Sequence, residues 1–158
     1  MIVRVVAVGR VKDAALRELC DAYAARVRRY QHLEIREVRE AGRRDRDAAA
    51  ARRREGEALL ATIPQGSHVV ALTRGGEAKT SEELAALVEA WRERARDVAF
   101  VVGGAHGLDA ALLDGAHLRL ALSDLTLPHE LARLVLLEQL YRAMTILRGE
   151  PYHKGSER

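Results

Sequence analysis

The spacing of hydrophobic and polar residues along the chain predicts strands that alternate with helices. Five short runs are either apolar throughout or alternate with polar residues, as β-strands do, and they cover residues 2–8, 33–38, 68–72, 98–102 and 117–122. Between and after them, apolar positions recur at helical spacing over residues 13–30, 47–61, 80–91, 109–115 and 128–147. Strands alternating with helices predict one α/β domain, residues 1–158, with a mainly parallel sheet.

Length and composition support this fold class. The 158 residues are enough for one domain with its own core, and the 48% hydrophobic and 31% charged shares are typical of a globular protein. The first residues, MIVRVVAVGR, suit a core strand better than a signal peptide, because Arg4 interrupts their apolar run. No stretch approaches the roughly 18 uncharged apolar residues of a membrane span. We therefore expect a cytoplasmic protein with no membrane contact.

The single cysteine and the absence of common catalytic motifs narrow the chemistry. Cys20 falls on the apolar stripe of the first helix, so we expect a buried structural thiol. The chain has no G-x-S-x-G elbow, no H-E-x-x-H pair and no cysteine-based metal pattern. We expect no metal.

Arginines cluster between residues 36 and 54. Only three of the 26 basic residues are lysines, and arginine favours planar, two-pronged contacts with phosphate. The cluster predicts either a phosphate-binding patch or a solvated face with internal ion pairs. The candidates for phosphate contacts are Arg43, Arg44, Arg52, Arg53 and Arg54.

Three loops that follow predicted strands are the candidate ligand site. In a parallel sheet, ligands bind beyond the carboxyl ends of the strands, which here selects residues 73–77, 103–107 and 123–129. The second loop, GGAHG, lets the backbone approach a ligand closely, although a tight structural turn explains it equally well. It matches neither the dinucleotide fingerprint nor a Walker A loop. This favours a cofactor that is held by backbone groups and not by a phosphate-binding loop.

The turn before the last helix has a structural explanation for most of its residues. Pro128 suits a first helical turn, Ser123 or Thr126 can cap nearby donors, and Glu130 complements the positive end of the helix. His129 is left open as either a surface histidine or a site residue.

The last helix and the tail suggest partners. Apolar residues cover more of the helix surface than one sheet face can bury, which predicts a homodimer. After the helix, Tyr152, His153 and Lys154 form a group that can stack on a base and contact phosphate, unless the tail is simply disordered.

Five stretches together resemble a known family. They are IVRVVAVGR at the start, ALTRGGE at 71–77, VVGGAHGL at 101–108, LSDLTLPHELARLVLLEQLYRA at 122–143, and the closing RGEPYHK. In this combination the chain resembles the SPOUT-class methyltransferases, and more narrowly the family of large-subunit rRNA pseudouridine-N3 methyltransferases. The likeness covers almost the whole chain in order.

The resemblance implies a fold, a cofactor and partners. It implies a SPOUT-type α/β fold with a C-terminal trefoil knot that binds S-adenosylmethionine, and a homodimer whose active site draws on both protomers. It also implies 23S rRNA of the assembled ribosome as substrate. By matching positions, the family's cofactor contacts fall on Leu72, Gly103, Leu122, Ser123, Asp124, Leu125, Thr126 and Leu127.

The implied reaction assigns roles to a few side chains. The N3 proton of the pseudouridine must leave near the time of attack, so the site needs a proton acceptor or a group that stabilises the imide anion. We assign anion stabilisation and substrate placement to Arg142, and base holding or proton acceptance to His153 with Tyr152. His129 is the second candidate base, because the positive end of a helix favours a neutral imidazole.

Two other functions compete with this interpretation. A SPOUT enzyme can act on another rRNA or tRNA nucleotide, and an RNA-binding or ribosome assembly protein can keep the fold without catalysis. Binding of S-adenosylmethionine separates an enzyme from a non-catalytic binder.

Overall fold

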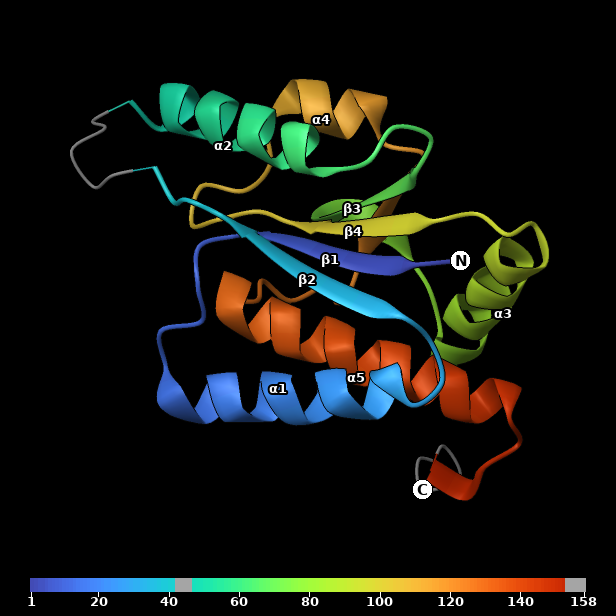
Figure 1. Ribbon diagram of the computed structural model, residues 1–158. Helices are drawn as coiled ribbons and strands as arrows, with labels where there is room; N and C mark the ends of the chain where they lie inside the picture. The colour runs from blue at the N-terminus through green and yellow to red at the C-terminus, as the bar shows by residue number, and fades with distance from the viewer. Residues whose placement is uncertain (42–46, 153–158) are drawn as a thin grey trace.

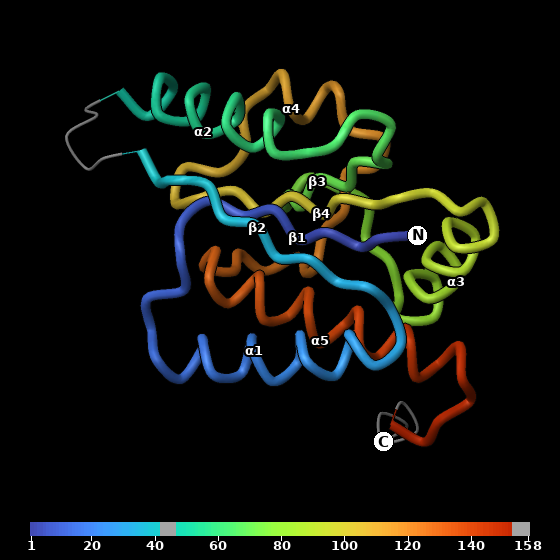
Figure 2. Tube along the Cα trace, in the orientation of Figure 1, coloured from blue at the N-terminus to red at the C-terminus, as the bar shows by residue number. Residues whose placement is uncertain are grey.

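A computed structural model describes residues 1–41 and 47–152 and confirms the predicted alternation. The elements, in chain order, are β1 (Val3–Val8), α1 (Ala14–Arg28), β2 (Leu33–Val38), α2 (Ala48–Thr62), β3 (His68–Ala78), α3 (Ser81–Glu93), β4 (Val98–Val102), α4 (Ala110–Gly115), β5 (Leu118–Ala121) and α5 (His129–Leu147). Figures 1 and 2 show a central sheet with helices on both faces.

All strand pairs in the sheet are parallel. The strand order is β2-β1-β4-β3-β5, so the carboxyl ends of all five strands lie along one edge. In Figure 1 that edge is on the left, where α1 and α5 begin. Strand β1 is fully buried, as its run of β-branched residues predicts for a central parallel strand.

Two hydrophobic cores fill the space on the two faces of the sheet. The larger core lies under α1, α3 and α5, and Phe100, Leu137 and Leu140 are among its fully buried residues. The smaller core lies under α2 and α4, around Leu59 and Leu112. Alternate strand residues point to opposite faces, which is why β1 contributes Val5 to one core and Val6 to the other.

Polar side chains fix the starts of several helices. Thr80 and Glu83 form the predicted capping box of α3, in which each side chain accepts the backbone N–H of the other. Asp13 accepts from the N–H of Leu16 at the start of α1. Of the two side chains expected to cap donors near α5, Ser123 accepts from the N–H of Leu125, whereas no side chain caps the helix itself and Pro128 occupies its N-cap position.

The third strand is longer than its apolar run predicts. We expected a flexible polar turn at 73–77, but β3 continues to Ala78 and pairs again with β5 after a register shift between Leu72 and Glu77. Gly76 permits this second pairing, because a Cβ on it would lie 2.6 Å from the backbone carbonyl carbon of Arg119. The polar residues of this segment are therefore held by the sheet.

Two buried residues, Arg4 and Cys20, carry a charged and a thiol side chain. Arg4 lies inside β1 and is buried, and it donates to Glu34 and to Asp97, each at 3.0 Å. These two carboxylates supply the ion pairs that a buried guanidinium requires. Cys20 is buried in the larger core, as predicted.

Helix α5 packs against the sheet, α1 and α3, and this accounts for much of its apolar surface. Leu136, Leu137 and Leu140 are completely buried within the protomer. Leu131 and Val135 are only partly buried and belong to neither core. The side chains left for a partner are therefore fewer than the sequence pattern suggests. Within the described ranges, no helix has the length and apolar character needed to cross a membrane.

Candidate functional site

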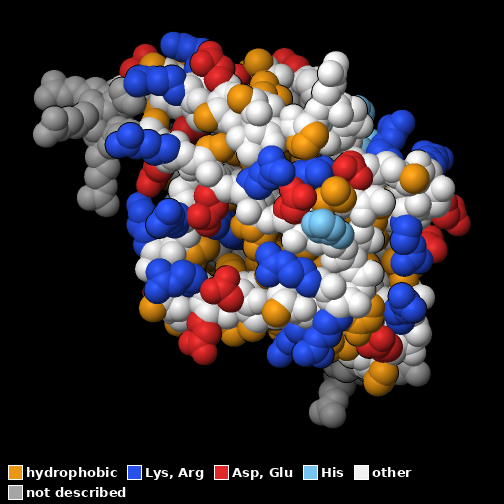
Figure 3. All heavy atoms as spheres, in the orientation of Figure 1, with side chains coloured by type: hydrophobic (Ala, Val, Ile, Leu, Met, Phe, Trp, Pro, Cys, Tyr) orange, Lys and Arg blue, Asp and Glu red, His pale blue; other side chains and the backbone are white. Residues whose placement is uncertain are grey.

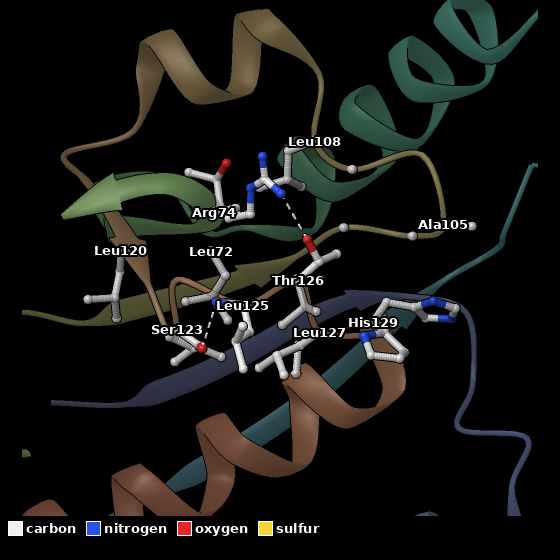
Figure 4. A pocket seen from close by; sticks show the side chains of 18 residues that line it. Leu72, Arg74, Ala105, Leu108, Leu120, Ser123, Leu125, Thr126, Leu127 and His129 are labelled. Atoms are coloured by element: carbon white, nitrogen blue, oxygen red, sulfur yellow. Dashed lines mark hydrogen bonds between the residues drawn. The ribbon is translucent and has the colours of Figure 1, made fainter. Parts of the chain in front are cut away.

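A pocket of about 640 Å³ lies at the carboxyl edge of the sheet. Residues 72–74 in the middle of β3, the end of β4 with the glycine loop, and the segment between β5 and α5 form its walls, so each of the three predicted segments contributes to it (Figure 4). Apolar side chains from each wall line it, including Leu72, Leu108 and Leu127. A pocket of this size that is mainly apolar suits a ligand of cofactor dimensions.

The glycine loop after β4 forms one wall through its backbone. The N–H of Gly107 donates to the carbonyl oxygen of Gly104 at 3.1 Å, which closes the loop on itself. A Cβ on Gly103 would lie 2.8 Å from the backbone of Gly107, and Gly107 has a φ of +77°. Both positions therefore require glycine, the first for close approach and the second for its left-handed conformation.

A buried carboxylate supports this loop from behind. Glu55 of α2 is 4% exposed, and its Oε1 accepts from the N–H of Ala41 at 2.9 Å. Among the described residues its Oε2 has no hydrogen-bond partner, and a Cβ on Gly104 would lie 3.2 Å from it. Glu55 thus binds the segment after β2 and lies close behind the glycine loop. Its position could not be predicted from the sequence, because a glutamate in a helix gives no sign of burial.

The segment between β5 and α5 forms the opposite wall. Leu122, Ser123, Leu125, Thr126 and Leu127 all line the pocket, and the resemblance assigns cofactor contacts to these five positions. The backbone turns tightly here, because the Oγ of Ser123 accepts from the N–H of Leu125 at 2.9 Å. Leu125 is 75% exposed, which is unusual for a large apolar side chain and typical of a ligand-facing one.

The other predicted cofactor contacts divide into two groups. Leu72 and Gly103 line the pocket. Asp124 is exposed and is not among the lining residues. The pocket therefore gathers all of the predicted set except this one carboxylate.

Arg74 is a pocket residue that the sequence did not single out. Its guanidinium donates from Nη1 to the Oγ of Thr126 at 3.0 Å, and Figure 4 shows it joining the two walls. Among the lining residues of the described chain, Arg74 is the only Lys or Arg, and no Asp or Glu accompanies it. The site therefore offers one positive charge without a compensating carboxylate.

His129 is the one predicted catalytic residue that lines this pocket. It begins α5, and its ring lies at the mouth beside Leu127 (Figure 4). No hydrogen bond to its side chain is present among the described residues, so nothing there fixes its tautomer.

Arg142 and Tyr152 form a second cluster, around Glu138 near the far end of α5. Glu138 Oε1 accepts from Arg142 Nη2 at 2.7 Å and from the Tyr152 hydroxyl at 3.1 Å. The Arg142 guanidinium lies over the Tyr152 ring, 4.9 Å from its centroid. Burial and a hydrogen bond shared with the Tyr23 hydroxyl raise the pKa of Tyr152 well above its usual range, so its phenol stays protonated.

The pocket and this cluster lie at opposite edges of the sheet. His129 and Arg142 are thirteen residues apart on α5, which is roughly 20 Å along a helix. Neither Arg142 nor Tyr152 lines the pocket of its own protomer.

The remaining predicted residues are either outside the described part of the chain or away from both places. His153, Arg43 and Arg44 lie outside the described residues. Arg52, Arg53 and Arg54 are exposed on α2. Across residues 1–41 and 47–152, no group of three or more His, Cys, Asp or Glu residues is arranged to hold a metal ion.

Comparisons with known proteins define the class. The family model described as "Predicted SPOUT methyltransferase" matches residues 1–153. A solved structure of a probable methylase family protein from Haemophilus influenzae Rd KW20 superposes with a TM-score of 0.56, covering 97% of this chain and 70% of that one. At 16% identity, that likeness concerns the fold alone.

Closer relatives share a more specific name. A ribosomal RNA large subunit methyltransferase H from Anaeromyxobacter sp. (strain Fw109-5) is 53% identical over 98% of this chain and 100% of the relative. One from Gemmatimonas aurantiaca is 46% identical with the same coverage. The chain therefore belongs to the SPOUT methyltransferase family and, within it, to the family of these ribosomal RNA large subunit methyltransferases. The resemblance seen in the sequence is confirmed.

Proposed function

We propose that this enzyme transfers a methyl group from S-adenosylmethionine to N3 of a pseudouridine in 23S rRNA of the assembled ribosome, in the cytoplasm. One observation carries the proposal: the glycine loop and the 122–127 segment meet in one pocket, in a chain whose relatives are named as large-subunit rRNA methyltransferases. A trefoil knot in this part of the chain stays a prediction.

The pocket's chemistry fits this cofactor. Leucine side chains from three walls offer apolar contacts to an adenine ring, and the backbone of the glycine loop offers hydrogen bonds at close range. Arg74 suits the carboxylate of the cofactor's methionine part. The cofactor supplies an electrophilic methyl group on a positively charged sulfonium.

The enzyme's own residues must hold the base and manage one proton. The N3–H of the target imide is weakly acidic, so a guanidinium beside its carbonyl oxygens favours the anion that attacks the methyl carbon. We assign this to Arg142, and we assign proton acceptance to His153, with His129 as second candidate. Tyr152, whose phenol stays protonated and donates to Glu138, helps to hold the base.

These assignments require two copies of the chain. Arg142 lies roughly 20 Å along α5 from its own pocket, so it reaches a pocket only if a second protomer presents it. A homodimer in which α5 of each protomer lies against the pocket edge of the other meets this need. The partly exposed Leu131 and Val135 near the start of α5 are available for such an interface.

Methyl transfer to ribosomes tests the function directly. Ribosomes from a strain that lacks the enzyme are incubated with the protein and S-adenosylmethionine, and the 23S rRNA is digested and analysed by mass spectrometry. We expect one methylated pseudouridine. Methylation of a different nucleotide, or of tRNA only, overturns the substrate, and no calorimetric binding of S-adenosylmethionine overturns the enzyme itself.

A mixed dimer tests the shared site. Gly103→Val disables the cofactor pocket of the protomer that carries it. Arg142→Ala disables the cluster around Glu138 near the far end of α5. If the two halves come from different protomers, mixing the variants restores one working site in each mixed dimer, which is about a quarter of normal activity after random exchange. If both halves come from one protomer, the mixture stays inactive.

A further inference from the structure

A second cavity, of about 290 Å³, lies beside the first turn of α5 at the same edge of the sheet. The loop after β1, the first half of α1 and the end of β2 surround it, together with α5. Its lining includes three arginines, Arg10, Arg17 and Arg133. We call it the arginine cleft. Figure 3 shows Lys and Arg side chains around a hollow on this side of the molecule, where α1 begins and β2 ends.

Arg133 forms the base of the arginine cleft. It is 3% exposed, and its two terminal nitrogens donate to Glu37 and to the carbonyl oxygen of Gly9. Its Nε–H has no acceptor within residues 1–41 and 47–152. A buried donor without a partner is costly, and an oxygen of a ligand that enters the cleft can satisfy it.

Arg10 and Arg17 bring more positive charge to the arginine cleft than its two carboxylates neutralise. The Arg10 side chain is 90% exposed, and its nearest carboxylate, Glu37 at 3.9 Å, already receives a hydrogen bond from Arg133. Arg17 has no ion pair in the described part of the chain. The remaining acidic side chain in the lining is Asp21, so three positive charges face two negative ones. Burial raises the pKa of the Cys20 thiol, so this side chain adds no negative charge.

The arginine cleft shares a wall with the cofactor pocket. Ala132 lines the pocket and Arg133, the next residue on α5, lines the cleft. His129, one turn earlier, lies at the pocket mouth. A nucleic-acid strand that places a base at that mouth therefore brings an adjoining part of its backbone over the first turn of α5.

We propose that the arginine cleft binds a phosphate group of RNA next to the nucleotide that is methylated. The identity of the ligand as RNA rests on the proposed function, whereas anion binding rests on the cleft alone. Arg52, Arg53 and Arg54, which were also expected to contact phosphate, lie on α2, on the opposite face of the sheet from α1 and α5 (Figure 1). The cleft instead lies directly beside the pocket.

The double variant Arg10→Gln/Arg17→Gln tests the cleft and spares Arg133, whose bonds to Glu37 and Gly9 support the fold. We expect the KM for ribosomes to rise about 10-fold or more, because charge-assisted hydrogen bonds to phosphate are lost. The slope of ribosome affinity against salt concentration should fall by about 1. The affinity for S-adenosylmethionine should not change, and kcat at saturating ribosomes should stay within about 2-fold.

A matched control separates this contact from the loss of net charge. Arg29→Gln/Arg94→Gln removes the same two charges from exposed positions after α1 and α3, at the other edge of the sheet. We expect the ribosome KM of this control to match that of the unmodified enzyme. An equal rise in both double variants overturns the proposal, because it shows only long-range attraction.

Inorganic phosphate provides a test that does not depend on methyl transfer. In a nitrogen-15 correlation spectrum, the Nε–H signal of Arg133 should shift as phosphate is added, and this shift should be lost in Arg10→Gln/Arg17→Gln. A shift with phosphate but an unchanged ribosome KM means that the cleft takes a free anion, which overturns RNA as its ligand. No shift and no KM change overturn the site altogether. If ribosomes are bound but not methylated, the proposed function is wrong. The affinity of the double variant for ribosomes, measured by direct binding, still tests the cleft.

Discussion

The two edges of the sheet differ in what their polar groups are bonded to. At the carboxyl edge, Arg74 and the glycine loop face a pocket that no described carboxylate lines, and Arg133 retains a donor without an acceptor in the same part of the chain. At the amino edge, Arg142 and Tyr152 are both bound to Glu138. The first edge is arranged to receive a ligand, whereas the second already satisfies its own charges. Arg142 can contact a substrate only if its guanidinium breaks its hydrogen bonds to Glu138 or donates to both partners at once.

The largest expected effect comes from Arg142, at the amino edge. Arg142→Ala should lower kcat for methyl transfer by about 10²- to 10³-fold, because it removes a donor that stabilises the developing anion. Calorimetry should show unchanged affinity for S-adenosylmethionine, since Arg142 does not line the pocket of its own protomer. A variant that retains normal turnover removes Arg142 from the mechanism.

Gly103 should produce the next largest effect, at the carboxyl edge. In Gly103→Ala the new methyl group meets the backbone of Gly107 at 2.8 Å. We expect affinity for the cofactor to fall about 10- to 100-fold, because the loop must shift. Gly115→Ala is the matched control, since nothing lies within 4 Å of its Cβ, and it should bind normally. Equal affinities in the two variants exclude the glycine loop as a cofactor wall.

A substitution of Arg74 tests which part of the cofactor lies beside the positive charge of the pocket. Arg74→Gln should weaken binding of S-adenosylhomocysteine about 10-fold, because a hydrogen bond to a carboxylate is lost. Binding of 5′-methylthioadenosine, which lacks the carboxylate, should be unaffected. If both ligands weaken equally, Arg74 acts instead by holding Thr126 and the two walls in place.

The smallest expected effect concerns a histidine pair at the amino edge. Burial, His117 and Arg96 lower the pKa of His68, whose ring lies 4.6 Å from that of His117. The unfolded chain therefore takes up a proton near pH 6.5 that the folded chain binds only at lower pH. Stability should fall as the pH drops below 6.5, by less than about 1 kcal/mol because the ring stays partly exposed.

Thermal denaturation at pH 7.5 and 5.5 checks this effect. In His68→Phe, the melting temperature should fall less between pH 7.5 and pH 5.5 than it does in the unmodified protein. In His106→Phe, at an exposed position of the glycine loop, the fall should equal that of the unmodified protein. An unaltered pH dependence in His68→Phe contradicts the assignment.

The sequence predicted the elements well where local pattern decides them. Strand β4 and the capping box of α3 follow from a run of apolar residues and a Thr-Glu spacing. The second half of β3 could not be predicted, because its polar residues join the sheet only through pairing with β5. Burial of Arg4 likewise depends on Glu34 and Asp97, which are distant in the chain.

The candidate site was predictable in its loops but not in its charges. Strand ends and glycines indicated the three pocket walls, because parallel strands bring their carboxyl ends together. Arg74, Arg133 and Glu55 were missed, since each depends on a partner from another element. No sequence pattern places the far end of α5 next to a pocket of another protomer.

Glu55 has a consequence for how this protein can change over evolution. Its carboxylate oxygen lies 3.2 Å from the position that a Cβ on Gly104 would take, and the Val8 side chain lies 3.0 Å from it. A side chain at position 104 thus becomes acceptable only when both neighbours give way, for example with aspartate at position 55 and a smaller residue at position 8. The three positions should therefore behave epistatically, so that the effect of a substitution at 104 depends on the residues at 8 and 55.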